Sequence, residues 1–359
     1  MGKFDKDRFQ KEMAIRYCLA RGLSPALEVL VPSASDLSDT VEVLTDIDVL
    51  GLEFIADGGF RRTVFDCKTG NKMSPSSRAF WAAGLSSYMG CDDAVIILKQ
   101  RAVYNHRISA LRIGVDLHDD LSFDDLGKTF DLEFAKDKYY QSSVDRWNAV
   151  YDIYQKDGWS ENLYNIGRNA APVSREPWRV FRRLVAELRS VKGQFDPEKD
   201  RHVVIFLDTL AGAFVLWASL GRDIRRFFDP KMTKVEFETA LRYYIWGGKE
   251  SFQIRQEMRQ RAEANGTVQE FPAWDRFVAL AGVVITAPQD LFRCVNICRD
   301  IAIRLACGRD PDHEKRLSQA IVASNRARQF IMGLTDYLIA ASGLPKDLSA
   351  RVHREFDGL

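Results

Sequence analysis

The strongest constraint on the fold is that strand-like patterns are confined to the first third of this 359-residue chain. Four runs rich in β-branched and other apolar residues occupy 41–55, 61–68, 94–99 and 111–117. Helical spacing of apolar residues surrounds them, at 7–21, 76–90 and 103–110. Helices and strands that alternate in this way predict a mixed sheet with helices on its faces, an α/β (α+β) arrangement.

Two segments between these elements carry turn signals. Residues 24–39, SPALEVLVPSASDLSD, contain two prolines and four serines, and we expect irregular structure there. The tripeptide Asp57-Gly58-Gly59 lies between the first two strand runs, where it favours a hairpin. Such a hairpin would make these two strands antiparallel neighbours.

Beyond about residue 140 the strand patterns fade and only helical spacing remains. We therefore predict two domains, an α/β domain at 1–135 and an all-helical domain at 136–359. The longest apolar run, at 203–220, contains Asp208, so we expect it to be a buried core helix and not a membrane span.

Charge, cysteine content and motifs exclude several classes of protein. The 51 basic residues nearly balance the 50 acidic ones, which argues against a generally basic nucleic-acid-binding surface, and 46% hydrophobic residues argue against disorder. The six cysteines are scattered and the N-terminus is charged, so we expect a reduced, cytoplasmic protein without a signal peptide or membrane segment. A phosphate-binding loop motif is missing, so the chain is not expected to hydrolyse nucleoside triphosphates by itself.

The motif TVFDCKTG, residues 63–70, places an acid and a lysine on the same face of an expected strand. Alternate strand residues point to the same side, so Asp66 and Lys68 share one face while Phe65 and Cys67 occupy the other. If Phe65 and Cys67 pack into the core, the acid and the lysine emerge together at the end of the strand.

A second acidic motif, TDIDVLG at residues 45–51, obeys the same alternation and places Asp46 and Asp48 on one face. The expected hairpin would bring Asp48 beside Asp66. Carboxylates held close repel each other, and a hard divalent cation such as Mg²⁺ relieves that repulsion. With a lysine to stabilise phosphate charge, these residues predict a phosphodiester hydrolysis site, the alternative being a solvated strand edge with ordinary ion pairs.

Taken with the order of the elements, Asp48 and the run Asp66-Cys67-Lys68 resemble the PD-(D/E)XK nuclease superfamily, which has the restriction-endonuclease-like fold. The core of that family runs helix, three strands, helix, strand, and the resemblance covers about residues 5–118. It implies that Asp48 and Asp66 bind Mg²⁺ or Mn²⁺, that Lys68 completes the catalytic set, and that the Cys67 carbonyl adds a metal ligand. The chain departs from the pattern in having no proline before Asp48.

Many members of that family also carry a glutamate on the first helix that reaches the metal. By position Glu12 is the candidate here, with Glu28 and Glu42 as competitors. Asp46 is a further candidate, because it shares a strand face with Asp48.

Several basic residues are candidates for contacts with nucleic acid. They are Lys72, Arg78 and Lys99 around the motif, and Arg179, Arg182 and Arg183 in the basic helical stretch 174–193. Solvated side chains paired with neighbouring acids are the alternative for each of them.

The sequence therefore favours a Mg²⁺- or Mn²⁺-dependent nuclease in which Asp48 and Asp66 hold metal and Lys68 orients the attacking water. DNA is the substrate that the family resemblance favours, with roles in genome defence or repair consistent with it. The helical domain is expected to recognise substrate, a protein partner or a second copy of the chain. The alternative is an inactive nuclease fold that serves as a nucleic-acid-binding or assembly module.

Overall fold

The computed structural model describes residues 4–33, 42–55, 59–70, 73–262, 270–357 and 359. These residues pack into two compact units. The first contains the residues up to Ile55, Phe60–Lys156 and Ala302–Ser318, and the second contains mainly Asp157–Ile301 and Gln319–Leu359. The structure thus divides the chain differently from the cut predicted between residues 135 and 136.

The first unit extends beyond residue 135 because the following helix shares its core. Helix α5 (Val144–Lys156) contributes Val144 and Trp147, both completely buried, to the apolar cluster that also holds residues of the first helix. Burial of two large side chains in that cluster ties α5 to the sheet-containing unit.

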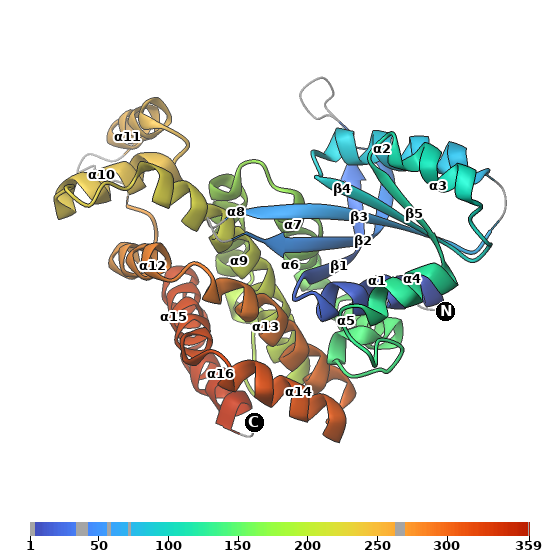
Figure 1. Cartoon of the computed structure of the whole chain (residues 1–359). Helices are drawn as coiled ribbons and strands as arrows, with labels where there is room; N and C mark the ends of the chain where they lie inside the picture. Colours follow the sequence, from blue (N-terminus) through green and yellow to red (C-terminus); the bar gives the residue numbers. More distant parts are fainter. Residues whose placement is uncertain (1–3, 34–41, 56–58, 71–72, 263–269, 358) are drawn as a thin grey trace. The chain divides into compact units, whose positions relative to one another are not determined.

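A five-stranded mixed sheet forms the centre of the first unit, which confirms the predicted mixed sheet (Figure 1). Its strands, in spatial as well as chain order, are β1 (Ser24–Pro32), β2 (Val43–Phe54), β3 (Phe60–Lys68), β4 (Asp93–Leu98) and β5 (Val115–Asp119). Strands β1, β2 and β3 pair antiparallel, while β4 and β5 continue the sheet in parallel with β3.

Four helices cover the two faces of the sheet (Figure 1). Helices α1 (Arg8–Ala20) and α4 (Asp120–Lys128) pack on one face, and α2 (Pro75–Met89) and α3 (Tyr104–Leu111) pack on the other. Each pair of parallel strands is connected by one helix: α2 connects β3 to β4, and α3 connects β4 to β5.

Strand alternation supplies each face with its own core. Phe65 and Cys67 of β3 are buried in the cluster beneath α1, as the alternation predicted. Ala94 and Ile96 of β4 are buried in the second cluster, beneath α2. The middle strands therefore have no solvated face, so a polar side chain on β3 enters a covered region.

Strand β1 corrects the expectation of irregular structure at its position. Ser24–Pro32 is a strand paired with β2, although Pro25 and Pro32 lie within it. The prolines are tolerated because β1 is an edge strand, where a residue without an N–H can face away from its partner. The antiparallel pairing of β2 with β3 agrees with the expected hairpin, but Asp57 and Gly58 of its turn lie outside the described residues.

After β5 the described residues form helices and no further strand, which confirms the helical C-terminal region. The short helical turns are η2 (Tyr140–Ser142), η3 (Gly158–Ser160), the π-helical η4 (Asn165–Ala170) and η5 (Lys192–Gln194). The helices after α5 are α6 (Glu161–Tyr164), α7 (Ala171–Val173), α8 (Pro177–Ser190), α9 (Asp200–Phe227), α10 (Lys234–Ile245), α11 (Lys249–Ala262), α12 (Trp274–Thr286), α13 (Asp290–Cys307), α14 (Pro311–Val322), α15 (Asn325–Ser342) and α16 (Asp347–Asp357).

Helix α9 is the central helix of the second unit. By length and composition it could cross a membrane, but its most apolar window is completely buried inside the protein. Asp208 in its middle is paired with Arg168 at 2.8 Å. A buried, paired acid on a helix packed on all sides agrees with the expected core helix.

Gly212 of α9 gives a test of this packing. A Cβ atom at Gly212 would lie 2.7 Å from the Cα atom of Gly167 in η4, whereas a Cβ atom at Gly282 of α12 would meet nothing within 4 Å. We expect Gly212→Ala to lower the free energy of unfolding by about 1–3 kcal/mol, because the backbones of α9 and η4 must move apart. Gly282→Ala should raise it by about 0.5–1 kcal/mol through helix propensity. Chemical denaturation of both variants checks this, and an equal effect of the two would contradict the close helix crossing.

Candidate functional site

The candidate site lies where β2 and β3 stop pairing. Their ladder runs from Phe54 opposite Phe60 to Val49 opposite Phe65. Two residues beyond Phe65, the Cys67 N–H donates to the Asp48 carboxylate, at 2.9 Å. Because the N–H and carbonyl of a strand residue point to the same side, the Cys67 carbonyl also faces this gap. The Asp48 side chain thus takes the place of a backbone partner.

Lys68, at the end of β3, joins three carboxylates. Its Nζ atom lies 2.7 Å from Asp48 Oδ2, 3.5 Å from Asp66 Oδ1 and 3.7 Å from Asp7 Oδ2. Burial lowers the pKa of Lys68, but Asp48 and Asp66 outweigh it and raise the pKa above the usual value. Lys68 is therefore a permanent cation, which suits it to stabilise negative charge and not to abstract a proton.

Asp66 is more enclosed than its sequence pattern predicted. Its side chain is 1% exposed, because α2 covers this face of β3 and brings Arg78 against it. The guanidinium binds through two atoms, with Arg78 Nη2 at 2.6 Å from Asp66 Oδ1 and Nε on the other oxygen. Burial raises the pKa of Asp66, and the Arg78 charge favours the ionised form.

A second group of carboxylates adjoins this pair across β2. Glu28, Asp46 and Asp48 each offer one oxygen such that the three oxygens lie within 4.8 Å of one another. Leu27 pairs with Val49 and Val29 with Ile47, which places Glu28 opposite Asp48. Three carboxylate oxygens at such spacing form a set that a hard divalent cation can take.

The backbone at Glu28 is strained. Its φ of 48° lies in the left-handed region, which a glutamate in a strand rarely adopts. Such a conformation costs about 1–3 kcal/mol, and side chains held this way cluster at functional sites. In this strand it coincides with the position whose carboxylate joins Asp46 and Asp48.

Glu28 and Asp46 share a proton in the absence of a cation. Burial, followed by the hydrogen bond to Asp46, raises the pKa of Glu28 to about 7. The same hydrogen bond lowers the pKa of Asp46. Below about pH 7 the pair therefore carries about one negative charge, and a bound cation would displace the proton.

Lys11 of α1 also contacts this group. Its side chain is completely buried, its Nζ atom binds the Glu28 carboxylate, and Asp48 Oδ1 lies 3.6 Å away. A buried ammonium keeps its charge only when carboxylates surround it. Lys11 thus fixes the positions of two of the three clustered acids.

The charges of the site leave room for a divalent cation. Five carboxylates, Asp7, Glu28, Asp46, Asp48 and Asp66, surround three cationic side chains, Lys11, Lys68 and Arg78, which is an excess of two negative charges when all are ionised. A cavity of about 650 Å³ opens beside them, lined among others by Asp46, Lys68 and Arg78. The donor set and the excess charge could hold a divalent cation at Glu28, Asp46 and Asp48.

The other sequence candidates near the motif are not brought to this cluster. Glu12 Oε1 accepts from Arg8 and, at 3.0 Å, from the Val144 N–H, so its carboxylate serves the junction with α5. Glu42 is exposed ahead of β2, where its backbone pairs with Ser33. Lys99 is exposed after β4 and lines a different cavity, and Lys72 lies outside the described residues.

The basic candidates of the helical region lie in the second unit. Arg179, Arg182 and Arg183 project from α8 and line a separate cavity there. They are not part of the acidic site of the first unit.

Sequence reasoning missed Asp7 and Lys11. Asp7 occupies the cap position before α1 with a φ of 55°, and it accepts from the Thr69 N–H at 2.8 Å. The signal for Lys11 was its position on the same helical stripe as Ile15 and Cys18, both completely buried. A lysine on an apolar stripe needs a buried partner, and that partner is Glu28.

No family model, no curated protein and no solved structure matches this chain.

The raised pKa of Glu28 predicts a pH dependence of stability in metal-free protein. Between about pH 4.5 and 7 the folded state holds a proton that the unfolded state releases, so the free energy of unfolding falls as pH rises. We expect Glu28→Gln to remove this pH dependence. The melting temperature of the variant minus that of the original chain should therefore rise between about pH 4.5 and 7 and stay constant at higher pH. Thermal melts with a chelator check this, and exposed Glu42→Gln, the control, should show no such trend.

Cation binding gives a second test. We expect Mn²⁺ to raise the melting temperature more at about pH 8 than at about pH 5, because the proton shared by Glu28 and Asp46 must leave. Asp48→Asn should abolish most of the shift, whereas Asp116→Asn, at an exposed position of β5, should retain it. An equal Mn²⁺ shift in both variants would place the cation elsewhere.

Proposed function

We propose that this chain is a Mg²⁺- or Mn²⁺-dependent nuclease whose first unit has a restriction-endonuclease-like fold. The observation that carries the proposal is the contact of one ammonium, Lys68, with both Asp48 and Asp66 at the point where β2 and β3 separate. These are the three residues that the family resemblance selected. DNA is proposed as the substrate from that resemblance alone.

The topology of the first unit supports the same proposal. Its elements follow the order α1, β1, β2, β3, α2, β4, with three antiparallel strands and a fourth parallel to β3. This is the order of helix, three strands, helix and strand expected for that family. Strand β1, which the sequence did not predict, supplies the first of the three strands and with it Glu28.

Five side chains of the site have a chemical task in this proposal. Asp46, Asp48 and Glu28 would hold the cation, which when bound polarises a phosphate and makes a water more acidic. Lys68, held by Asp48, presents a fixed positive charge to a phosphate in the cavity beside it. Arg78 lines the same cavity and offers a second cation for the phosphate oxygens.

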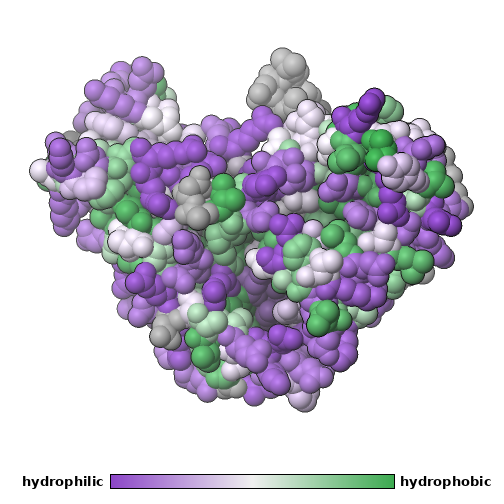
Figure 2. Space-filling view, viewed as in Figure 1, coloured by the Kyte–Doolittle hydropathy of each residue, from purple (hydrophilic) through white to green (hydrophobic). Residues whose placement is uncertain are grey.

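A second candidate function rests on the pairing of Asp66 with Arg78. A buried carboxylate bound through both oxygens is not available to a cation, which suits a nuclease fold that has lost its activity. Helices α2 and α3 expose apolar side chains, including Phe80, Tyr104 and Leu111, and Figure 2 shows hydrophobic residues gathered over them. Such a surface would serve an assembly module with a protein partner.

A cleavage assay distinguishes the two functions. We expect the purified chain with Mg²⁺ or Mn²⁺ to cut linear or plasmid DNA, and Asp48→Asn, Asp66→Asn and Lys68→Ala each to lose about 100-fold or more in rate. The matched controls are Asp116→Asn and Lys156→Ala, both at exposed positions of the same unit. Full activity in Asp66→Asn with loss in Asp48→Asn would show that Glu28, Asp46 and Asp48 hold the cation without Asp66. Equal rates in every variant would reject the site.

A further inference from the structure

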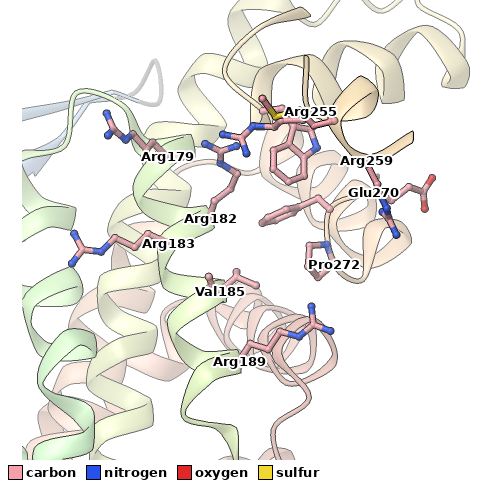
Figure 3. A pocket seen from close by; sticks show the side chains of 13 residues that line it. Arg179, Arg182, Arg183, Val185, Arg189, Arg255, Arg259, Glu270 and Pro272 are labelled. Atoms are coloured by element: carbon pink, nitrogen blue, oxygen red, sulfur yellow. The ribbon is translucent and has the colours of Figure 1, made fainter. Parts of the chain in front are cut away.

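A cavity of about 990 Å³ in the helical unit is lined by six arginines (Figure 3). They come from two helices: α8 supplies Arg179, Arg182, Arg183 and Arg189, and α11 supplies Arg255 and Arg259. Glu270 is the one acidic residue among the described residues that line it. The cavity therefore has a strong positive potential in a chain whose overall charge is close to zero.

Arg182 is the most constrained of these side chains. Its guanidinium carbon lies 5.0 Å from the ring centre of Trp178 and 4.9 Å from that of Trp246. Among the described residues, its buried Nε and Nη1 atoms find no hydrogen-bond partner. Buried donors without acceptors are costly, and an anion in the cavity would supply those acceptors.

A second arginine approaches the same aromatic ring. The guanidinium carbon of Arg255 lies 5.4 Å from the ring centre of Trp246. Burial, and then the positive charges of Arg255 and Arg179, lower the pKa of Arg182 to about 10. Figure 3 shows Arg182 from α8 and Arg255 from α11 reaching toward each other. Like charges held together on one ring are stabilised by an anion placed against both.

The rest of the lining is apolar. Val185, Met258, Phe271 and Pro272 form this part of the wall. An inorganic anion would leave that part unfilled, whereas a ligand with a phosphate and a flat organic ring would use both parts. The volume of about 990 Å³ lies at the upper end of the range for pockets that bind one small organic ligand.

We propose that this arginine pocket binds an organic phosphate of nucleotide size, with the phosphate on Arg182 and Arg255 and the ring against Met258 and Pro272. Phosphate is favoured over a carboxylate because it offers more acceptor oxygens and more charge to a group of guanidinium donors. The proposal goes beyond the nuclease function and does not depend on it, since the pocket lies wholly within the second unit.

Titration calorimetry on the full chain, without divalent cation and at constant ionic strength, tests the pocket. The probes are adenosine and guanosine mono- and triphosphates, a linear dinucleotide, inorganic phosphate and a single-stranded oligonucleotide. We expect at least one nucleotide or dinucleotide to bind with a Kd below about 100 µM and more tightly than inorganic phosphate. Arg182→Gln and Arg255→Gln should each weaken it about tenfold or more.

Two controls keep the test decisive. Arg293→Gln, at an exposed position of α13, should leave the affinity unchanged. Arg255 is itself exposed, so its variant reports on binding even if Arg182→Gln fails to fold. Binding of the oligonucleotide alone would replace the proposal with a strand-binding surface. Failure of every nucleotide to bind more tightly than inorganic phosphate, or unchanged affinity in both pocket variants, would overturn it.

Discussion

The candidate site depends on one interaction, the hydrogen bond from the Cys67 N–H to the Asp48 carboxylate. Where β2 and β3 stop pairing, two strands would otherwise leave backbone groups without partners inside a covered sheet. The carboxylate satisfies one of them and is held by it. Lys68 then binds Asp48 and draws in Asp66 and Asp7, so that side chains from β2, β3 and the start of α1 meet at one place.

The cost of burying these charges explains the composition of the site. Each carboxylate is stable there only with a cation or a shared proton, and Lys11, Lys68 and Arg78 supply the three cations. The remaining negative charge is reduced by the proton between Glu28 and Asp46. A divalent cation placed at these acids would compete with that proton.

The two units present opposite kinds of electrostatic site. The sheet-containing unit collects carboxylates around a cavity that suits a cation, whereas the helical unit collects guanidinium groups that suit an anion. In both sites, some buried side-chain polar atoms have no hydrogen-bond partner among the described residues. A near-neutral chain can thus carry two strongly charged sites of opposite sign.

The sequence by itself determined the mixed sheet, the helical C-terminal region and the alternation that separates Phe65 and Cys67 from Asp66 and Lys68, because periodicity is a local property. It did not reveal β1, since the tolerance of its prolines depends on its place at the sheet edge. Only the tertiary structure showed that Lys11 and Glu28 lie beside Asp48. It also showed that Glu12 accepts from the Val144 N–H and that Arg78 covers Asp66. These contacts join residues far apart in the chain, and their geometry depends on how helices pack on the sheet, which spacing along the sequence does not encode.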